Sequence, residues 1–251
     1  MGILPFRKSV PLTTREILIN NRKRLLNNET PFAIKEAYIK LRTSLMFCMT
    51  QDGGSVCRVF AVTSPNPSEG KSLTAANIAI SFAMLGRRTL LIDADMRKPT
   101  QRLLWNVRTT SGLCDYLAAI RPLETARVED LPLSLICTGT IPPNLASDRM
   151  KRFVSGCSRD YAYIFIDTPP INTVADAQIV SAFVDGVILV AKSGGTGADE
   201  LNAAISSVER AGGNLCGVVL NDVDIKAIRR FYRYDGRYGN QNAYMDSYGN
   251  K

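Results

Sequence analysis

Short apolar runs alternate with stretches of helical periodicity along most of this chain, and this alternation restricts its fold more than any other feature. The runs are rich in β-branched residues and have few polar interruptions, which is typical of strands buried on both faces of a sheet. Strands separated by helices pair in parallel, so we predict an α/β domain of three layers, a parallel sheet between two layers of helices. The expected strands are residues 59–63, 89–93, 133–137, 163–167, 187–191 and a last strand ending at residue 220. The expected helices among them are residues 71–85, 176–184 and 197–211.

Composition divides the 251 residues into three parts. Residues 56–228 carry the alternating pattern and form the predicted α/β domain. Residues 1–55 form an N-terminal arm with two helices, expected from Thr13 or Thr14 to about residue 26 and over residues 31–47. Residues 229–251 are rich in Tyr, Gly, Asn, Asp and Arg and have almost no aliphatic side chains. This composition predicts a flexible tail.

The composition also excludes several classes of protein. The chain has no histidine, which excludes a Ser-His-Asp mechanism, a histidine-ligated zinc site and the His-Arg-Asp loop of eukaryotic-type protein kinases. Its six cysteines form no CxxC pair, so we interpret them as small buried side chains in a reducing compartment. No apolar run reaches the length of a membrane span, and the N-terminus lacks the core of a signal peptide. We therefore expect a cytoplasmic protein.

The segment between the first expected strand and the helix after it predicts a phosphate site. It reads Ser64-Pro65-Asn66-Pro67-Ser68-Glu69-Gly70-Lys71-Ser72, and Gly-Lys-Ser at such a junction is the second half of a P-loop. Backbone N–H groups of the loop and of the helix N-terminus would surround phosphates. Lys71 would reach the β- and γ-phosphates, and the Ser72 hydroxyl would bind Mg²⁺. The loop departs from the consensus because Pro65 replaces its first glycine.

Three aspartates follow two other expected strands. Asp93 and Asp95 come at the end of residues 89–93, and Asp167 ends residues 163–167. In an open α/β sheet, ligands bind outside the carboxyl ends of the strands, so these side chains would face the same crevice as Lys71. Mg²⁺ takes carboxylate, hydroxyl and phosphate oxygens. The alternative is that each aspartate only ends a strand in a turn, but three of them beside Gly-Lys-Ser favour a Mg²⁺–nucleotide site.

These motifs resemble those of the MinD/ParA-like P-loop ATPases, and within that group the bacterial tyrosine kinases of capsule and exopolysaccharide loci. Residues 63–72 resemble the Walker A motif of the family. The run Ile92-Asp93-Ala94-Asp95-Met96-Arg97-Lys98-Pro99 resembles its second, kinase-specific acidic motif, which is the most specific of the three. Ile166-Asp167-Thr168-Pro169-Pro170 resembles its Walker B motif.

The resemblance implies a role for each matching residue. The catalytic residues would be Lys71, Asp93 and Asp95. Lys71 would hold the terminal phosphates of ATP, Asp93 would orient or deprotonate a tyrosine hydroxyl, and Asp95 would support the metal. Ser72, Asp95 and Asp167 would be the ligands of Mg²⁺. Arg97 would either stabilise phosphate charge or bind a carboxylate. The remaining residues expected to contact the nucleotide are Ser68, Glu69, Gly70, Leu73 and, as a weak candidate beside the base, Asn221.

The tail shows a further resemblance to the family. Five of the nine tyrosines lie in the last 20 residues, whereas flexible polar segments are normally poor in aromatic side chains. The resemblance implies that they are phosphorylated by a neighbouring subunit; the alternative is an adhesive tail that orders against the fold or a partner. The expected phosphoacceptors are Tyr232, Tyr234, Tyr238, Tyr244 and Tyr248.

Ser68 and Ile39 depart from the family pattern, and so does the run Asn144-Leu145-Ala146-Ser147, where the family usually has Asn-Pro-x-Glu. Ser68 stands where the loop usually has glycine, so a positive φ there would cost strain. The oligomerisation helix of the family carries Glu followed by Arg three and six residues later. Here Glu36 and Arg42 match, but Ile39 replaces the middle Arg. These positions lie near one helix face, so that face persists with one ionic contact missing.

The leading hypothesis is an ATP-dependent protein-tyrosine kinase that phosphorylates its own tail in trans and regulates capsular or exopolysaccharide polymerisation and export. The resemblance implies homo-oligomers and a membrane adaptor of the polysaccharide co-polymerase type, contacted by residues 1–55, which recruits the kinase to the inner face of the cell membrane. A protein-tyrosine phosphatase and other proteins would be further substrates.

Two alternatives stay open. A MinD/ParA-like ATPase switch would phosphorylate no protein, but such switches typically carry an extra lysine at the start of the P-loop, and residues 64–68 contain none. The net charge of +8 would suit a nucleic-acid binder, yet no binding module is recognisable and the arginines are scattered. We therefore expect no nucleic-acid partner.

Overall fold

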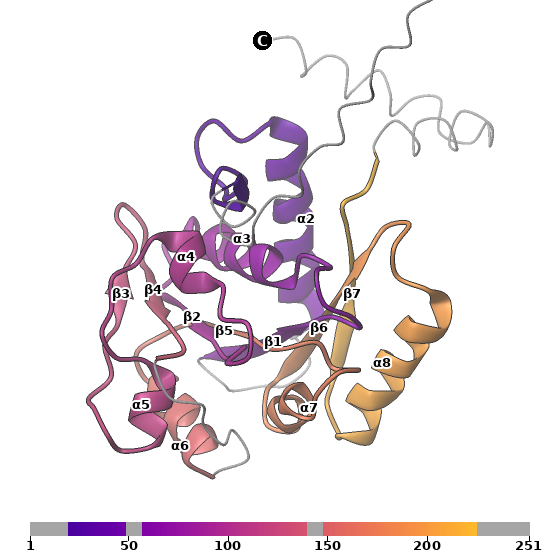
Figure 1. Ribbon diagram of the computed structural model, residues 1–251. Helices are drawn as coiled ribbons and strands as arrows, with labels where there is room; N and C mark the ends of the chain where they lie inside the picture. The colour runs from indigo at the N-terminus through magenta and orange to yellow at the C-terminus, as the bar shows by residue number, and fades with distance from the viewer. Residues whose placement is uncertain (1–19, 49–56, 140–147, 225–251) are drawn as a thin grey trace, which may run out of the picture.

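A seven-stranded sheet crosses the molecule with helices on both faces (Figure 1). The computed structural model describes residues 20–48, 57–139 and 148–224, and the structural statements below concern these residues. The strand order is β3-β4-β2-β5-β1-β6-β7. All neighbours pair in parallel except β3, which runs antiparallel to β4. The strands are β1 (Arg58–Thr63), β2 (Thr89–Asp93), β3 (Ala126–Arg127), β4 (Leu133–Ile136), β5 (Tyr163–Asp167), β6 (Gly186–Lys192) and β7 (Leu215–Asn221).

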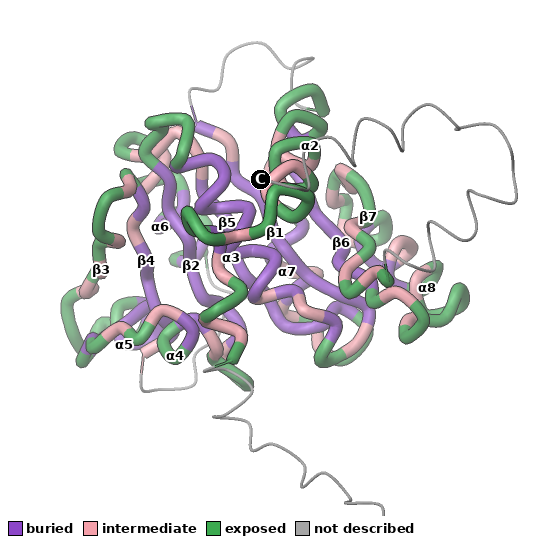
Figure 2. Tube along the Cα trace, turned by 90° about the horizontal axis from the view of Figure 1, so that it is seen from above, coloured by how far each residue is buried: buried purple, intermediate pink, exposed green. Residues whose placement is uncertain are grey.

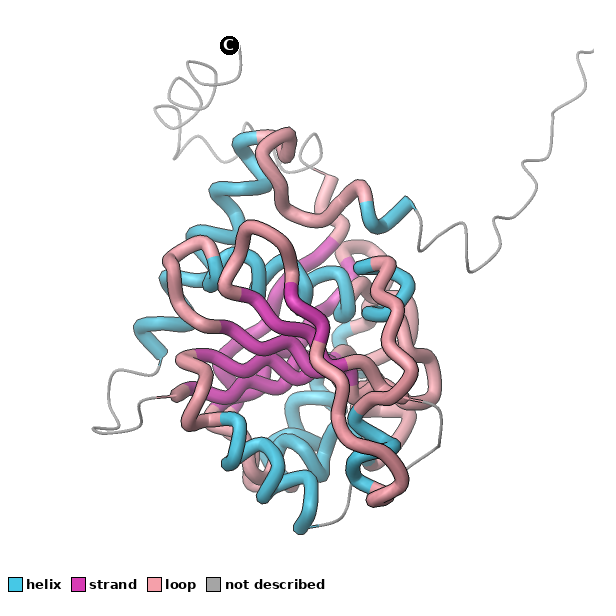
Figure 3. The backbone as a smooth tube through the Cα atoms, turned by 90° about the vertical axis from the view of Figure 1, so that its left-hand side faces the viewer, coloured by secondary structure: helices cyan, strands magenta, loops and turns pink. Residues whose placement is uncertain are grey.

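The helices form the two outer layers. In Figure 1, α2, α3 and α4 lie above the sheet, and α5 to α8 lie below it. Figure 3 shows the twisted sheet from its side, between these layers. None of the described helices is long and apolar enough to cross a membrane. The helices are α2 (Phe32–Cys48), α3 (Lys71–Ala83), α4 (Gln101–Trp105), α5 (Leu113–Leu117), α6 (Asp148–Cys157), α7 (Asp176–Ser181) and α8 (Ala198–Arg210).

Alternate residues of each strand enter opposite halves of the core, as the pleat requires. In β1, Phe60 and Val62 pack against α3, whereas Val59 and Ala61 belong to the cluster that includes α6, α7 and α8. The Phe60 ring stacks on Phe165 with centroids 5.3 Å apart. Figure 2 shows the central strands and α3 buried over most of their length, so the sheet is a rigid base for the loops at its carboxyl edge.

The sequence predicted this architecture closely. The six expected strands all form, with ends that differ by one residue at most. The expected helices form too, although α3 and α7 end two and three residues early. The pattern missed α6, and it missed β3 because two residues show no periodicity. β3 also makes the sheet mixed rather than purely parallel.

The first N-terminal helix differs from the expectation. Residues 20–22 are helical, but the chain turns at residues 23–25 rather than continuing as a helix to residue 26. The backbone N–H of Leu26 donates instead to Asn77 Oδ1 of α3, at 2.8 Å, and the Leu26 side chain is buried. The proposed caps at Thr13 and Thr14 lie outside the described residues.

Only some of the six cysteines are buried. Cys57, Cys114 and Cys137 are buried as expected, and none of the six forms a disulfide. Cys157 and Cys216 are half-buried. The expectation is wrong for Cys48, which lies exposed at the end of α2, where a helix meets solvent.

Candidate active site

The phosphate loop joins β1 to α3 and needs two residues in the left-handed region. Ser68 has a φ of 67° and Gly70 a φ of 90°. A side chain at Gly70 would displace the Asn221 amide, and this φ is one that side chains rarely adopt, so glycine is favoured there by conformation above all. Ser68 adopts a backbone that glycine would adopt at lower cost, as its departure from the family pattern predicts.

The Glu69 side chain stabilises the phosphate loop through hydrogen bonds. Its Oε2 accepts the backbone N–H of Asn66 at 2.8 Å, and its Oε1 accepts the Thr196 hydroxyl at 2.5 Å. Asn221 Nδ2 donates to the Glu69 carbonyl at 2.9 Å. The Glu69 side chain is thus occupied by protein partners, which leaves its backbone as the part that can face a phosphate.

Lys71 lies among carboxylates at the start of α3. Its Nζ is 2.6 Å from Asp95 Oδ2 and 3.6 Å from Asp167 Oδ1, and it donates to the Ser72 hydroxyl at 3.2 Å. Burial by itself would lower the pKa of Lys71, but the surrounding carboxylates outweigh burial and raise that pKa. The ammonium stays charged and ready to bind an anion.

Asp93 and Asp167 are fully buried and face each other across neighbouring strands. Burial raises the pKa of Asp93 well above its usual value, and the nearby Asp167 carboxylate raises it further. Burial also raises the pKa of Asp167, although Lys71 counteracts part of the effect. One lysine cannot neutralise three ionised carboxylates, so a bound cation would favour their charged forms.

One buried oxygen is left for such a cation. Asp167 Oδ1 has no hydrogen-bond partner among the described residues, although buried polar atoms are normally paired. The described residues contain no cluster of three or more acidic, cysteine or histidine side chains arranged as a complete metal site. Mg²⁺ usually binds one or two carboxylates and completes its shell with phosphate and water, so Asp167, Asp95 and Ser72 fit it as a partial site.

Gln101 is a member of this site that the sequence motifs did not indicate. It is fully buried at the start of α4, two residues beyond the acidic run. Its backbone N–H donates to Asp93 Oδ2 at 3.0 Å, and its Nε2 donates to Asp167 Oδ2 at 2.8 Å. No P-loop consensus covers this position, so only the fold could reveal it.

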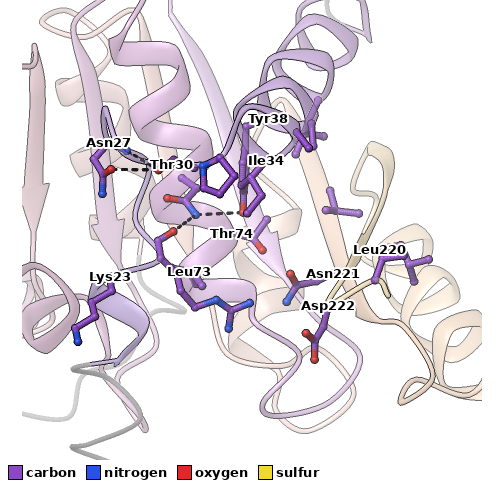
Figure 4. Close-up of a pocket in the computed structure, with 18 of the residues that line it drawn as sticks. Lys23, Asn27, Thr30, Ile34, Tyr38, Leu73, Thr74, Leu220, Asn221 and Asp222 are labelled. Atoms are coloured by element: carbon purple, nitrogen blue, oxygen red, sulfur yellow. Dashed lines mark hydrogen bonds between the residues drawn. The ribbon is translucent and has the colours of Figure 1, made fainter. Parts of the chain in front are cut away.

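A pocket of about 750 Å³ opens beside the loop, between α2, the first turn of α3 and the end of β7 (Figure 4). Leu73 and Thr74 line it from α3, and Asn221 and Asp222 line it from the end of β7. Two residues predicted to contact a nucleotide, Leu73 and Asn221, therefore share one pocket at the first turn of α3.

Other predicted residues lie apart from this group. Arg97 Nε is 3.3 Å from Asp176 Oδ2 on the surface, which favours the carboxylate alternative for that side chain. The five tail tyrosines lie outside the described residues.

Comparison with known proteins identifies the family. Residues 60–234 match the model of the CobQ/CobB/MinD/ParA nucleotide binding domain. The chain is 35% identical over 216 residues to the tyrosine-protein kinase YwqD of Bacillus subtilis, an alignment that covers 84% of this chain and 88% of YwqD. It is 32% identical over 212 residues to the tyrosine-protein kinase CpsD of Streptococcus agalactiae, covering 82% and 90% of the two chains. The chain belongs to the bacterial tyrosine kinases.

Solved structures of this kinase family agree. The kinase domain of the Escherichia coli tyrosine kinase ETK superposes with a TM-score of 0.71 at 32% identity, over 75% of each chain. The chimerical protein CapA2B2 gives a TM-score of 0.69 at 33% identity, over 74% of this chain and 83% of the other. MinD of Aquifex aeolicus gives 0.59 at 23% identity, over 70% and 73%, which shows a shared fold alone. The recognised motifs and the fold are thus those of a nucleotide-binding kinase domain.

Proposed function

We propose that this bacterial tyrosine kinase transfers the γ-phosphoryl group of ATP to tyrosine hydroxyls, including those of its own tail. The convergence of Lys71, Ser72 and three carboxylates at the carboxyl ends of β1, β2 and β5 is the observation that carries the proposal. Phosphoryl transfer depends mainly on positioning and on neutralising charge, and this cluster supplies both.

Each residue has a role that follows from its place. Lys71 binds the β- and γ-phosphate oxygens, and its ion pair with Asp95 breaks when it does so. Ser72, Asp95 and Asp167 hold Mg²⁺, which when bound neutralises phosphate charge. The tyrosine oxygen forms a bond to the γ-phosphorus while the bond to ADP breaks, and Asp93 accepts the hydroxyl proton.

The pocket in Figure 4 suits the nucleobase. Asn221 uses its Nδ2 on the Glu69 carbonyl, which leaves Oδ1 as an acceptor. An acceptor pairs with the amino group of adenine and repels the O6 of guanine, so we infer a preference for ATP over GTP.

Phosphate mapping tests the kinase. The purified chain is incubated with Mg²⁺ and ATP, alone and with membrane extract from its host, and phosphate is located by mass spectrometry. We expect phosphate between Tyr232 and Tyr248 in the unchanged protein, and none in Lys71→Met. Lys151→Met, an exposed lysine on α6, is the matched control and should behave as the unchanged protein. Hydrolysis of ATP without phosphotyrosine, even with the extract, would instead support the MinD/ParA-like switch.

The partners belong to the same proposal. A membrane adaptor of the polysaccharide co-polymerase type recruits the chain to the inner face of the membrane and activates it, and the chimeric nature of the similar CapA2B2 supports a second component. The resemblance to the family also implies that the kinase regulates capsular or exopolysaccharide polymerisation and export. It further implies that the kinase phosphorylates other proteins, such as a tyrosine phosphatase. The chain also associates with itself, so that one copy offers its tail to the next.

A further inference from the structure

Gln101 joins the three segments that build the site. Besides the bonds to Asp93 and Asp167, its Nε2 donates to the Ser72 carbonyl of α3 at 2.9 Å. Gln101 thus connects all three segments: its side chain reaches the P-loop helix and the end of β5, and its backbone N–H reaches the acidic run after β2. Few other contacts in the described residues connect these segments through side chains, apart from those of Lys71 itself.

The orientation of the Gln101 amide is determined by its partners. A carboxylate and a backbone carbonyl only accept, so they must face the NH₂ group. The indole Nε1 of Trp105 only donates, and it donates to Gln101 Oε1 at 3.0 Å from one helical turn further along α4. A flipped amide would lose all three hydrogen bonds, so Trp105 holds Gln101 in a single orientation.

This arrangement decides which oxygen of Asp167 is available. Gln101 occupies Oδ2, while Oδ1 accepts no hydrogen bond among the described residues and faces the Lys71 ammonium at 3.6 Å. Without the amide, the carboxylate would be free to rotate between its two oxygens. The bond from the Gln101 backbone to Asp93 likewise holds the proposed proton acceptor in place.

We propose that Gln101 is a positioning residue that fixes Asp167 for Mg²⁺ and Asp93 for the tyrosine, and that Trp105 holds it in place. The proposal rests on the proposed nucleotide site but not on kinase activity, because it concerns Mg²⁺ binding. Trp105 is the single tryptophan of the chain, so its fluorescence reports on this network without interference.

The test measures Mg²⁺-dependent binding of ADP to the full chain. Binding of a fluorescent ADP analogue is followed with EDTA and across a Mg²⁺ titration, and indole emission is recorded with unlabelled ADP. In the unchanged protein we expect Mg²⁺ to tighten ADP binding and to shift the indole emission. In Gln101→Met we expect unchanged binding in EDTA, a Mg²⁺ affinity weaker by about 10–100-fold, and no emission shift.

Two further variants separate positioning from folding. Leu103→Met lies exposed on the same helix and should keep the Mg²⁺ affinity of the unchanged protein. Trp105→Phe retains an aromatic ring and leaves only Gln101 Oε1 unpaired, so it folds and should weaken Mg²⁺ affinity by about tenfold, which tests the network even if Gln101→Met unfolds.

The outcomes distinguish this proposal from the proposed function. Equal Mg²⁺ affinity in the unchanged protein, Gln101→Met and Trp105→Phe would overturn the positioning role. Failure of the unchanged protein to bind ADP with or without Mg²⁺ would overturn the proposed nucleotide site itself.

Discussion

Ser68 stores backbone strain at the phosphate loop. Its φ of 67° is one that a side chain disfavours, and the residue is exposed, so no packing contact compensates. We predict that Ser68→Gly raises the free energy of unfolding by about 0.5–1 kcal/mol, since relief of strain exceeds the added entropy of the unfolded chain. Urea unfolding measures this. Ser68→Ala keeps the strained side chain and should give no gain; a gain equal to that of glycine would contradict the explanation.

Thiol reactivity should follow burial. Burial raises the pKa of Cys114 to about 12 and that of Cys137 to about 11. Below these values the thiols remain protonated, so at pH 8 less than about 0.1% of either is thiolate. We predict that iodoacetamide first modifies the exposed Cys48, as peptide mapping will show, and that Cys48→Ser removes the fast phase. Equally rapid modification of Cys114 in the folded protein would disprove this order.

Sequence patterns predicted the charged members of the site but not their supports. The predicted charged residues all follow apolar strands, so the ends of the predicted strands were enough to indicate them: Lys71, Asp93, Asp95 and Asp167. Gln101 belongs to no such pattern, because its importance comes from three hydrogen bonds, two of them to segments that are distant in the chain.

Helix α2 has one side fixed to the fold and another exposed. Arg42, which matches an arginine in the oligomerisation helix of the family, donates to the Ser81 carbonyl at 2.5 Å and to the Ser81 hydroxyl at 3.3 Å, so it holds α2 to α3. Phe32, Ile39 and Met46 are spaced by seven residues and therefore share one face. They are 53%, 39% and 42% exposed, which makes an apolar stripe at the position of the missing Arg.

We predict that this stripe mediates self-association. A charge in its centre, Ile39→Asp, should shift the protein toward monomers in sedimentation velocity, because the charge would be buried without a partner. The unfolding free energy should change by no more than about 0.5 kcal/mol, since the residue is exposed in the single chain. Ile120→Asp introduces the same charge at a 56% exposed site after α5 and should leave assembly unchanged. Equal assembly of both variants would exclude the stripe as an interface.

Regular elements were predictable because their periodicity is local, whereas short or irregular ones were not. β3 pairs with β4, and the turn before Leu26 is held by Asn77 of α3, which accepts the Leu26 N–H and donates to the Arg24 carbonyl. Such elements depend on tertiary contacts that a local pattern does not contain.

Phosphorylation of the tail would change the net charge of the whole molecule. The chain carries a net charge of +8, and five phosphates would add about −7.5 to −10, which offsets nearly all of it or more. We predict that phosphorylation loosens association between copies, because the phosphates offset the positive charge of the arginines in the tail. Native mass spectrometry before and after incubation with Mg²⁺ and ATP compares the assemblies, with Lys71→Met as control. Identical assemblies in both states would contradict the prediction.

Phosphorylation of one chain by another is best measured by mixing two different variants. Lys71→Met with an intact tail supplies acceptors but no catalysis, and a chain with all five tail tyrosines changed to Phe supplies catalysis but no acceptors. The two are mixed with Mg²⁺ and ATP, and phosphate is mapped on each. We expect phosphotyrosine on the tail of the Lys71→Met chain in the mixture and none when that chain is alone. An unmodified tail in a mixture whose active chain still hydrolyses ATP would show that this protein does not phosphorylate its neighbours.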